Sequence, residues 1–320
     1  RQHFNTIQPL LEKVGVRVGI LTGSTRAAER RKLLAELQSG ELSMLIGTHA
    51  LIEEVVQFKN LGLAIIDEQH RFGVAQRAQL QKKGIQPPHV LVMTATPIPR
   101  TLAMTAYGDL DYSVIDEMPP GRQPVKTVHR HETRRAQVME FIRTEIDKGR
   151  QVYIIFPLIE ESAKLDYENL MKGYEQVKSW FPEPTYWISM VHGKQPADQK
   201  ETNMRRFVEH DTQIMVSTTV IEVGVNVPNA SIMIIESAER FGLSQLHQLR
   251  GRVGRGRDAS SCLLVHSPGL SDGEKRRLLV LRDSEDGFVI AEEDLKSRGG
   301  GDALHVSLDE ISSDELKETE

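Results

Sequence analysis

Short apolar runs recur along the chain, and amphipathic stretches separate them. The runs are rich in β-branched residues and leucine, and most of them end in polar residues. This alternation is typical of βαβ units, in which helices cover both faces of a parallel sheet. The expected strands are residues 16–21, 43–47, 61–66, 90–94, 151–156, 187–191, 213–217, 231–235 and 260–265. The expected helices include residues 27–38, 132–148 and 196–209.

A dense cluster of breaker residues interrupts this pattern between residues 118 and 124, which read Met-Pro-Pro-Gly-Arg-Gln-Pro. The pattern restarts beyond the cluster, so we interpret it as an interdomain linker. A chain of 320 residues is long enough for two compact domains. The sequence therefore predicts two α/β domains in tandem.

The composition is compatible with a packed core, with 39% hydrophobic residues and 27% charged residues to cover the surface. No apolar run approaches the ~18 residues of a transmembrane helix, and the opening Arg1-Gln2-His3-Phe4 is no secretory signal. We therefore expect an internal segment of a longer protein. The single cysteine, Cys262, excludes an intrachain disulfide and is expected in the core.

The formal net charge of −5 does not by itself indicate a nucleic-acid-binding protein. Basic residues nevertheless cluster at residues 26–32 and again at Arg250, Arg252, Arg255 and Arg257. Such clusters suit a protein that grips phosphates, although a solvated helix face explains the first one equally well.

The strongest local signal is the run 63–70, Leu-Ala-Ile-Ile-Asp-Glu-Gln-His, in which an apolar strand ends in two adjacent carboxylates. This places Asp67 and Glu68 at the carboxyl edge of a parallel sheet, where α/β proteins bind ligands. One carboxylate can hold Mg²⁺ through water while the other orients an attacking water. The alternative is a strand that ends in a solvated acidic turn.

Residues 67–73 resemble motif II of superfamily 2 helicases, and residues 94–102 resemble their motif III. The resemblance makes Gln69 and His70 part of the catalytic motif together with Asp67 and Glu68. It also gives Thr94 and Thr96 a role in coupling the nucleotide site to the partner domain. Thr96 additionally has a structural interpretation, as the N-cap of a helix that starts at Pro97.

Residues 248–257 resemble motif VI, in which glycines let the backbone approach phosphates while arginines fork onto their oxygens. The resemblance implies that Gln248 binds the nucleotide and that Arg252 and Arg255 act as arginine fingers. The alternative is a flexible basic loop that binds any polyanion.

Residues 217–226 resemble motif V, whose members contact the DNA backbone and the nucleotide ribose. The resemblance implies that Gly224 and Asn226 bind the nucleotide. Asn226 stands where the family commonly has Asp, which removes the charge for an ion pair with a motif VI arginine.

Further strand-end loops resemble those that touch DNA in this superfamily, although each is also an ordinary turn. The expected DNA-binding residues are Thr22, Gly23, Thr48, His49, His192, Gly193, Thr218 and Thr219.

Residues 107–122 separate this chain from the transcription-repair coupling factor and make it similar to the RecG family of bacterial superfamily 2 translocases. The resemblance covers residues 1–302 and implies two RecA-like parallel-sheet domains, the first incomplete at its N-terminus, with a short helical C-terminal extension. Arg298 falls in the translocation motif and is assigned a coupling role. The implied divisions are domain 1 at 1–118, a linker at 119–125, domain 2 at 126–268, the translocation-motif region at 269–302 and an acidic, disordered tail at 303–320.

The family resemblance implies an ATP-dependent DNA helicase that remodels stalled forks and Holliday junctions in recombination and repair. It implies ATP and Mg²⁺ as cofactors, branched DNA as partner, and a monomer recruited by single-strand-binding protein in the bacterial cytoplasm, at the nucleoid.

One element of the family is missing, because no G-x-x-x-x-G-K-[ST] phosphate-binding loop occurs in the 320 residues. We expect this loop, like the family's wedge domain, to lie upstream of Arg1, and we expect the chain alone to be inactive. The alternative is a non-catalytic nucleic-acid-binding or interaction module that has lost the loop.

Overall fold

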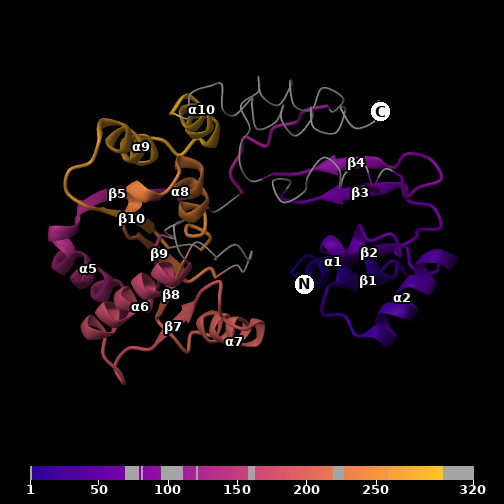
Figure 1. Ribbon diagram of the computed structural model, residues 1–320, viewed down its shortest axis with the longest axis horizontal. Coiled ribbons are helices and arrows are strands. Elements are labelled where there is room, and N and C mark those ends of the chain that lie inside the picture. The colour runs from indigo at the N-terminus through magenta and orange to yellow at the C-terminus, as the bar shows by residue number, and fades with distance from the viewer. Residues whose placement is uncertain are drawn as a thin grey trace. The chain divides into compact units, whose positions relative to one another are not determined.

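The computed structural model describes residues 2–68, 79–80, 82–94, 111–119, 122–157, 163–218, 227–256 and 258–297 (Figure 1). The chain divides into two compact units, Arg1–Ala95 and Thr96–Glu320. Each unit is an α/β structure with parallel strand pairs, as the apolar runs predict.

The first unit carries two pairs of parallel strands, β1 with β2 and β3 with β4. Its elements are α1 (Gln2–Glu12), β1 (Val18–Leu21), α2 (Ala27–Ser39), β2 (Met44–Gly47), the 3-10 turn η1 (His49–Leu51), β3 (Leu63–Ile66) and β4 (His89–Val92).

Close packing holds α2 on the β1–β2 pair. A Cβ added to Gly19 would lie 2.9 Å from a methyl carbon of both Leu33 of α2 and Leu42, so a larger residue there would force these leucine side chains to shift. The second pair differs, because only alternate residues of β3 are buried. Leu63 and Ile65 are 55% and 50% exposed, so the expected coverage of both faces is wrong for β3 in the described part of the chain.

The second unit is built on a six-stranded parallel sheet of order β5-β10-β9-β6-β8-β7. Its strands are β5 (Val125–His131), β6 (Gln151–Ile155), β7 (Ile188–Val191), β8 (Ile214–Ser217), β9 (Ala230–Ile235) and β10 (Ser260–His266). Its helices are η3 (Glu132–Arg134), α5 (Arg135–Asp147), α6 (Ala163–Trp180), α7 (Ala197–Val208), η4 (Ala238–Arg240), α8 (Leu243–Arg250), α9 (Asp272–Asp283) and α10 (Gly287–Ser297).

The inner strands β6, β8 and β9 are buried on both faces, which explains their continuously apolar sequences. Successive side chains of β6 enter different cores: Val152 shares a core with residues of α5 and α6, whereas Tyr153 shares one with residues of α7, α8, α9 and α10. Cys262 lies fully buried in the second of these cores, and desolvation raises its thiol pKa to about 12. The thiol is therefore neutral, and the prediction of a core cysteine is confirmed.

The nine predicted strands and three predicted helices are confirmed, most with shifts of one or two residues at their ends. The first turn of the helix predicted at 132–148 is the 3-10 turn η3. The elements that were not expected include α1, α8 and the edge strand β5, whereas α9 and α10 lie in the expected helical C-terminal extension.

Removing the ring of Phe207 should destabilise the second unit strongly. This side chain of α7 is fully buried, and its ring centroid lies 5.0 Å from that of Tyr153. We expect Phe207→Ala to lower the free energy of unfolding by about 3–5 kcal/mol, because it leaves a cavity. Urea unfolding followed by circular dichroism measures this change. The neighbouring Val208→Ala, at a side chain that is 37% exposed, is the matched control and should change stability by less than ~1 kcal/mol.

Candidate functional site

Asp67 and Glu68 lie directly after β3, and Thr94 follows β4. The ladder between the two strands continues past them, because the amide of Met93 donates to the carbonyl of Ile66 at 2.8 Å. The two carboxylates and Thr94 therefore emerge from the same carboxyl edge of the β3–β4 pair, as the sequence predicts.

The backbone turns sharply at this edge. Glu68 has a φ of 53°, in the left-handed region that residues other than glycine rarely adopt. The Glu68 amide donates to Asp67 Oδ1 at 2.9 Å, which helps to fix the turn. A residue in this conformation persists only where the surrounding structure holds it in place, and such residues are frequent at functional sites.

A residue that the sequence did not indicate also contacts this site. His3 on α1 lies 2.9 Å from Asp67, measured from Nε2 to Oδ2. The carboxylate nevertheless remains accessible, since its side chain is 43% exposed. Because this contact joins residues 64 positions apart, no local sequence signal could have found it.

The predicted DNA-binding residues of the first unit meet at the carboxyl edge of the β1–β2 pair. Leu21 pairs with Gly47, so Thr22 and Thr48 leave the two strands side by side. Gly47 must be glycine, because a Cβ there would lie 2.2 Å from the Leu21 carbonyl oxygen. Of the four predicted positions at this edge, Gly23, Thr48 and His49 are exposed.

The second unit brings His192, Gly193 and Thr218 together at the carboxyl edge of β7 and β8. Val191 pairs with Ser217, whose hydroxyl donates to the Val191 carbonyl at 2.7 Å. His192 and Thr218 are buried, whereas Gly193 is exposed. This edge is therefore compact, with Gly193 at its accessible tip.

The surroundings of His192 are basic and aromatic. Desolvation, followed by the charges of Lys200 and Lys194, lowers the pKa of His192. Lys200 donates to the Gly193 carbonyl at 2.7 Å, and the ring of Tyr167 lies 5.3 Å from that of His192. Tyr167 comes from α6 and is 41% exposed, and sequence reasoning did not single it out.

Arg252 and Arg255 lie in the turn after α8, where the chain passes from the helix toward β10. Arg255 is exposed and its Nε donates to the Gly251 carbonyl at 3.1 Å. Desolvation and the neighbouring charges of Arg252 and Arg122 lower the pKa of Arg255, which still remains charged at neutral pH. Gln248 sits on α8 itself, one turn before Arg252.

Arg250 has a different role from the one its position in the basic cluster indicated. Its side chain is buried, and Nη1 donates to the carbonyls of Leu281 and Ser284 at 2.6 and 2.8 Å. It therefore ties α8 to the C-terminal end of α9 and is not available to a phosphate. The physical reason is the helical spacing, which turns Arg250 toward α9.

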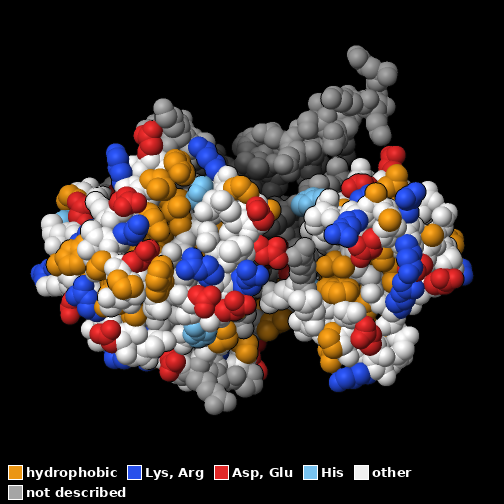
Figure 2. Space-filling view, turned by 90° about the horizontal axis from the view of Figure 1, so that it is seen from below, with side chains coloured by type: hydrophobic (Ala, Val, Ile, Leu, Met, Phe, Trp, Pro, Cys, Tyr) orange, Lys and Arg blue, Asp and Glu red, His pale blue; other side chains and the backbone are white. Residues whose placement is uncertain are grey.

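The first basic cluster also engages in ion pairs, since Arg30 pairs with Glu53 at 2.5 Å. On the face shown in Figure 2, positive and negative side chains are interspersed over both units. The surface drawn there shows no extended patch of side chains with the same charge, in line with the small net charge of the protein.

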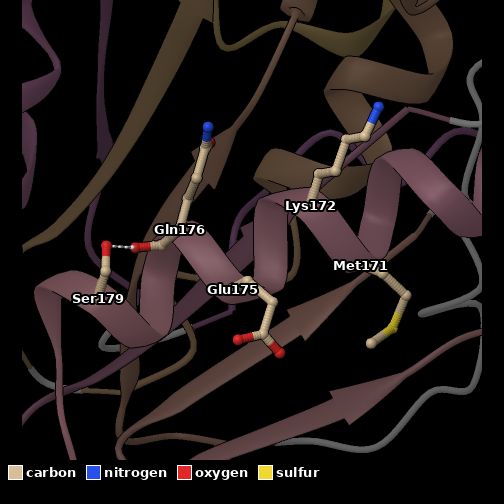
Figure 3. A pocket seen from close by; sticks show the side chains of 5 residues that line it. All are labelled: Met171, Lys172, Glu175, Gln176 and Ser179. Carbon is tan, nitrogen blue, oxygen red and sulfur yellow. Dashed lines mark hydrogen bonds between the residues drawn. The ribbon is translucent and has the colours of Figure 1, made fainter.

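A surface pocket on α6 is lined by Met171, Lys172, Glu175, Gln176 and Ser179 (Figure 3). All five residues come from this one helix, and none of them is a predicted site residue. The hydroxyl of Ser179 donates to the backbone carbonyl of Gln176 at 2.6 Å, which is a local helix contact. The pocket therefore adds nothing to the candidate site.

Several predicted site residues lie outside the described part of the chain: Gln69, His70, Thr96, Thr219, Gly224, Asn226 and Arg298. Among the residues that are described, no group of three or more His, Cys, Asp or Glu is arranged to hold a metal ion. Every helix in the described ranges is too short or too polar to cross a membrane.

Comparisons with known proteins identify the family of the chain. Residues 1–105 match the family model for DEAD/DEAH box helicases, and residues 133–257 match the helicase conserved C-terminal domain. A solved structure of Mycobacterium smegmatis helicase Lhr has the same fold, with a TM-score of 0.57 at 16% identity over 78% of this chain and 35% of that one. Two RecA-like domains with these motifs define the helicase core of superfamily 2.

The ATP-dependent DNA helicase RecG of Synechocystis sp. is 54% identical over 95% of this chain and 36% of the relative. RecG of Streptococcus pneumoniae is 52% identical over 94% of this chain and 44% of that protein. A structure of RecG bound to a three-way DNA junction matches with a TM-score of 0.76 and 44% identity, over 94% of this chain and 39% of that one. The chain belongs to the RecG family, and it spans less than half of the length of these relatives.

The contact between His247 and Arg250 should make stability depend on pH. Arg250 Nη2 lies 3.0 Å from His247 Nδ1, and a guanidinium can only donate, so this nitrogen must be unprotonated. Desolvation and the charges of Arg250 and Arg122 lower the pKa of His247 from 6.5 to about 4. The folded state therefore resists protonation, and this stabilisation is complete above pH 6.5 and lost as the pH falls toward 4.

Urea unfolding between pH 4 and 8 measures this effect against His247→Asn, which keeps a neutral acceptor. We expect the wild-type protein to lose stability relative to the variant below pH 6.5, and the difference to be constant above pH 7. Parallel stability curves for the two proteins would contradict the assignment.

Proposed function

We propose that this chain is part of an ATP-dependent DNA translocase that remodels branched DNA, such as stalled forks and Holliday junctions, in recombination and repair. The carrying observation is the placement of Asp67, Glu68 and Thr94 at one sheet edge of a chain in the RecG family. Relatives named ATP-dependent DNA helicase RecG, and a RecG structure bound to a three-way DNA junction, support the substrates proposed.

In this proposal Asp67 holds Mg²⁺ through water and Glu68 activates the attacking water. The donor set fits, because Mg²⁺ is usually bound by one or two carboxylates together with substrate phosphates and waters, and Asp67 is a single accessible carboxylate. When bound, Mg²⁺ would neutralise charge on the phosphates of ATP. Gln69 and His70 extend the same catalytic motif.

Arg252 and Arg255 supply positive charge to the phosphoryl group that is transferred, which stabilises the transition state more than the ground state. Gln248, Gly224 and Asn226 bind the nucleotide in the same proposal. Thr94, Thr96 and Arg298 couple nucleotide turnover to domain movement.

DNA contacts are proposed at the two strand-end clusters, mainly to backbone phosphates and therefore independent of base sequence. These are Thr22, Gly23, Thr48 and His49 in the first unit, and His192, Gly193, Thr218 and Thr219 in the second. The proposed divisions are domain 1 at 1–118, a linker at 119–125, domain 2 at 126–268 and the translocation-motif region at 269–302. We further propose a monomer in the bacterial cytoplasm, at the nucleoid, recruited by single-strand-binding protein.

Glu68→Gln tests the catalytic assignment in a protein that carries these residues together with a phosphate-binding loop. We expect branched DNA to stimulate ATP hydrolysis by the wild type. The variant should lose hydrolysis by at least about a hundredfold and keep ATP binding, because an amide cannot accept a proton from water. Steady-state hydrolysis and nucleotide titration give the two readings. Undiminished turnover in the variant would remove Glu68 from its role.

The 320 residues alone test the expectation that a chain without the phosphate-binding loop binds DNA but does not hydrolyse ATP, which holds equally for the alternative of a non-catalytic DNA-binding module. We expect this chain to bind branched DNA in low salt, with affinity falling as salt rises, and to show no hydrolysis of ATP. Anisotropy titration and phosphate release measure the two properties. DNA-stimulated hydrolysis by this chain would show that the loop is dispensable.

A further inference from the structure

Arg122 reaches the arginine turn from a distant part of the sequence. It lies just before β5, and its Nη2 donates to the Gly251 carbonyl at 3.4 Å. The same oxygen accepts the Nε–H of Arg255 at 3.1 Å. Two guanidinium groups that share one acceptor lie side by side, with Arg252 next to them in the turn.

The backbone around Arg122 is fixed against the same turn. Gly254 has a φ of 76°, and a Cβ there would lie 2.7 Å from a methyl carbon of Val125 and 3.3 Å from the Gln123 carbonyl oxygen. The Val125 amide in turn donates to the Glu285 carboxylate at 2.8 Å. The segment that carries Arg122 is therefore packed on the arginine turn and anchored on its other side.

The three guanidinium groups of Arg122, Arg252 and Arg255 form no ion pair with a carboxylate among the described residues. Two carboxylates that follow α9 bond to backbone amides: Glu285 accepts from Val125, and Asp286 accepts from Phe288 at 2.8 Å. Like charges brought together without a counter-charge repel one another. A single bond of 3.4 Å to a neutral carbonyl is too weak to offset this repulsion.

An anionic ligand with several negative charges would offset the repulsion between these guanidinium groups. A chain of phosphates presents oxygens to several guanidinium groups at once, and arginine binds them in a forked geometry. We propose that Arg122 is a third phosphate-binding arginine of this site, and that it binds the polyphosphate group of a nucleoside triphosphate together with Arg252 and Arg255. The inference rests on the proposed function of the two motif arginines and extends their site to a residue of another segment.

Binding of inorganic tripolyphosphate to the 320-residue chain tests the inference. Calorimetric titration at low ionic strength with a metal chelator present isolates the contribution of the side chains. Arg122→Ala should weaken binding about tenfold, the effect of losing one charge-assisted contact. Arg122→Lys should recover most of the affinity, because it restores the charge without the fork.

Arg130→Ala is the matched control, since it removes the same charge from β5, where Arg130 is exposed and donates to the carbonyl of its neighbour His129. It should bind tripolyphosphate like the wild type. Thermal unfolding of each variant shows whether it still folds. Recovery of affinity in Arg122→Lys would show that the positive charge at this position acts on the ligand and that the side chain is not only structural.

The outcomes separate this inference from the proposed function. Equal affinities of Arg122→Ala and Arg130→Ala would overturn the inference, and so would absence of tripolyphosphate binding by the wild type. If Arg122→Ala weakened binding of a short DNA duplex but not of tripolyphosphate, the assignment to a nucleotide would also fall. A double Arg252→Ala/Arg255→Ala variant that bound tripolyphosphate normally would overturn the shared site of the inference, but it would leave the role of Glu68 in the proposed function untouched.

Discussion

Burial of both faces of the six-stranded sheet is the constraint on which the second unit depends. Side chains of β6 and β9 enter two separate cores, and helices from both halves of this unit cover them. Because all the strands run in parallel, their carboxyl ends meet at one edge, and the loops after β7 and β8 lie together there. The same burial fixes α8, and with it the turn that carries the arginines, against the sheet.

How well a strand could be predicted from the sequence depended on how deeply it is buried. Strands such as β6, which is buried along its whole length, have continuously apolar sequences that can be recognised without any neighbour. Among the described strands, the edge strand β5 pairs with β10 alone, and its sequence Val-Lys-Thr-Val-His-Arg-His is largely polar. A half-exposed edge strand of this composition has no strong local signal, so only its pairing with β10 reveals it.

The residues of the candidate site likewise fall into those that the sequence could indicate and those that it could not. Asp67, Glu68 and the turn arginines follow from motifs, because their chemistry needs particular residues in an unbroken order. His3 and Arg122 approach those motifs from distant positions, at separations of 64 and 129 residues, so no local pattern indicates them. Three-dimensional packing alone brings such partners together.

The arginines in and after α8 show why one role cannot be assigned to every residue of a basic cluster. Arg250 lies within the helix and faces α9, where backbone carbonyls replace the water that its charge has lost. Arg252 and Arg255 follow the helix, in a turn whose Gly254 has a left-handed backbone, and Arg255 stays exposed. Removing Arg250 would therefore loosen the contact between α8 and α9. The same change at Arg255 would leave the fold in place, since the only bond that this side chain makes in the described structure goes to the neighbouring carbonyl of Gly251.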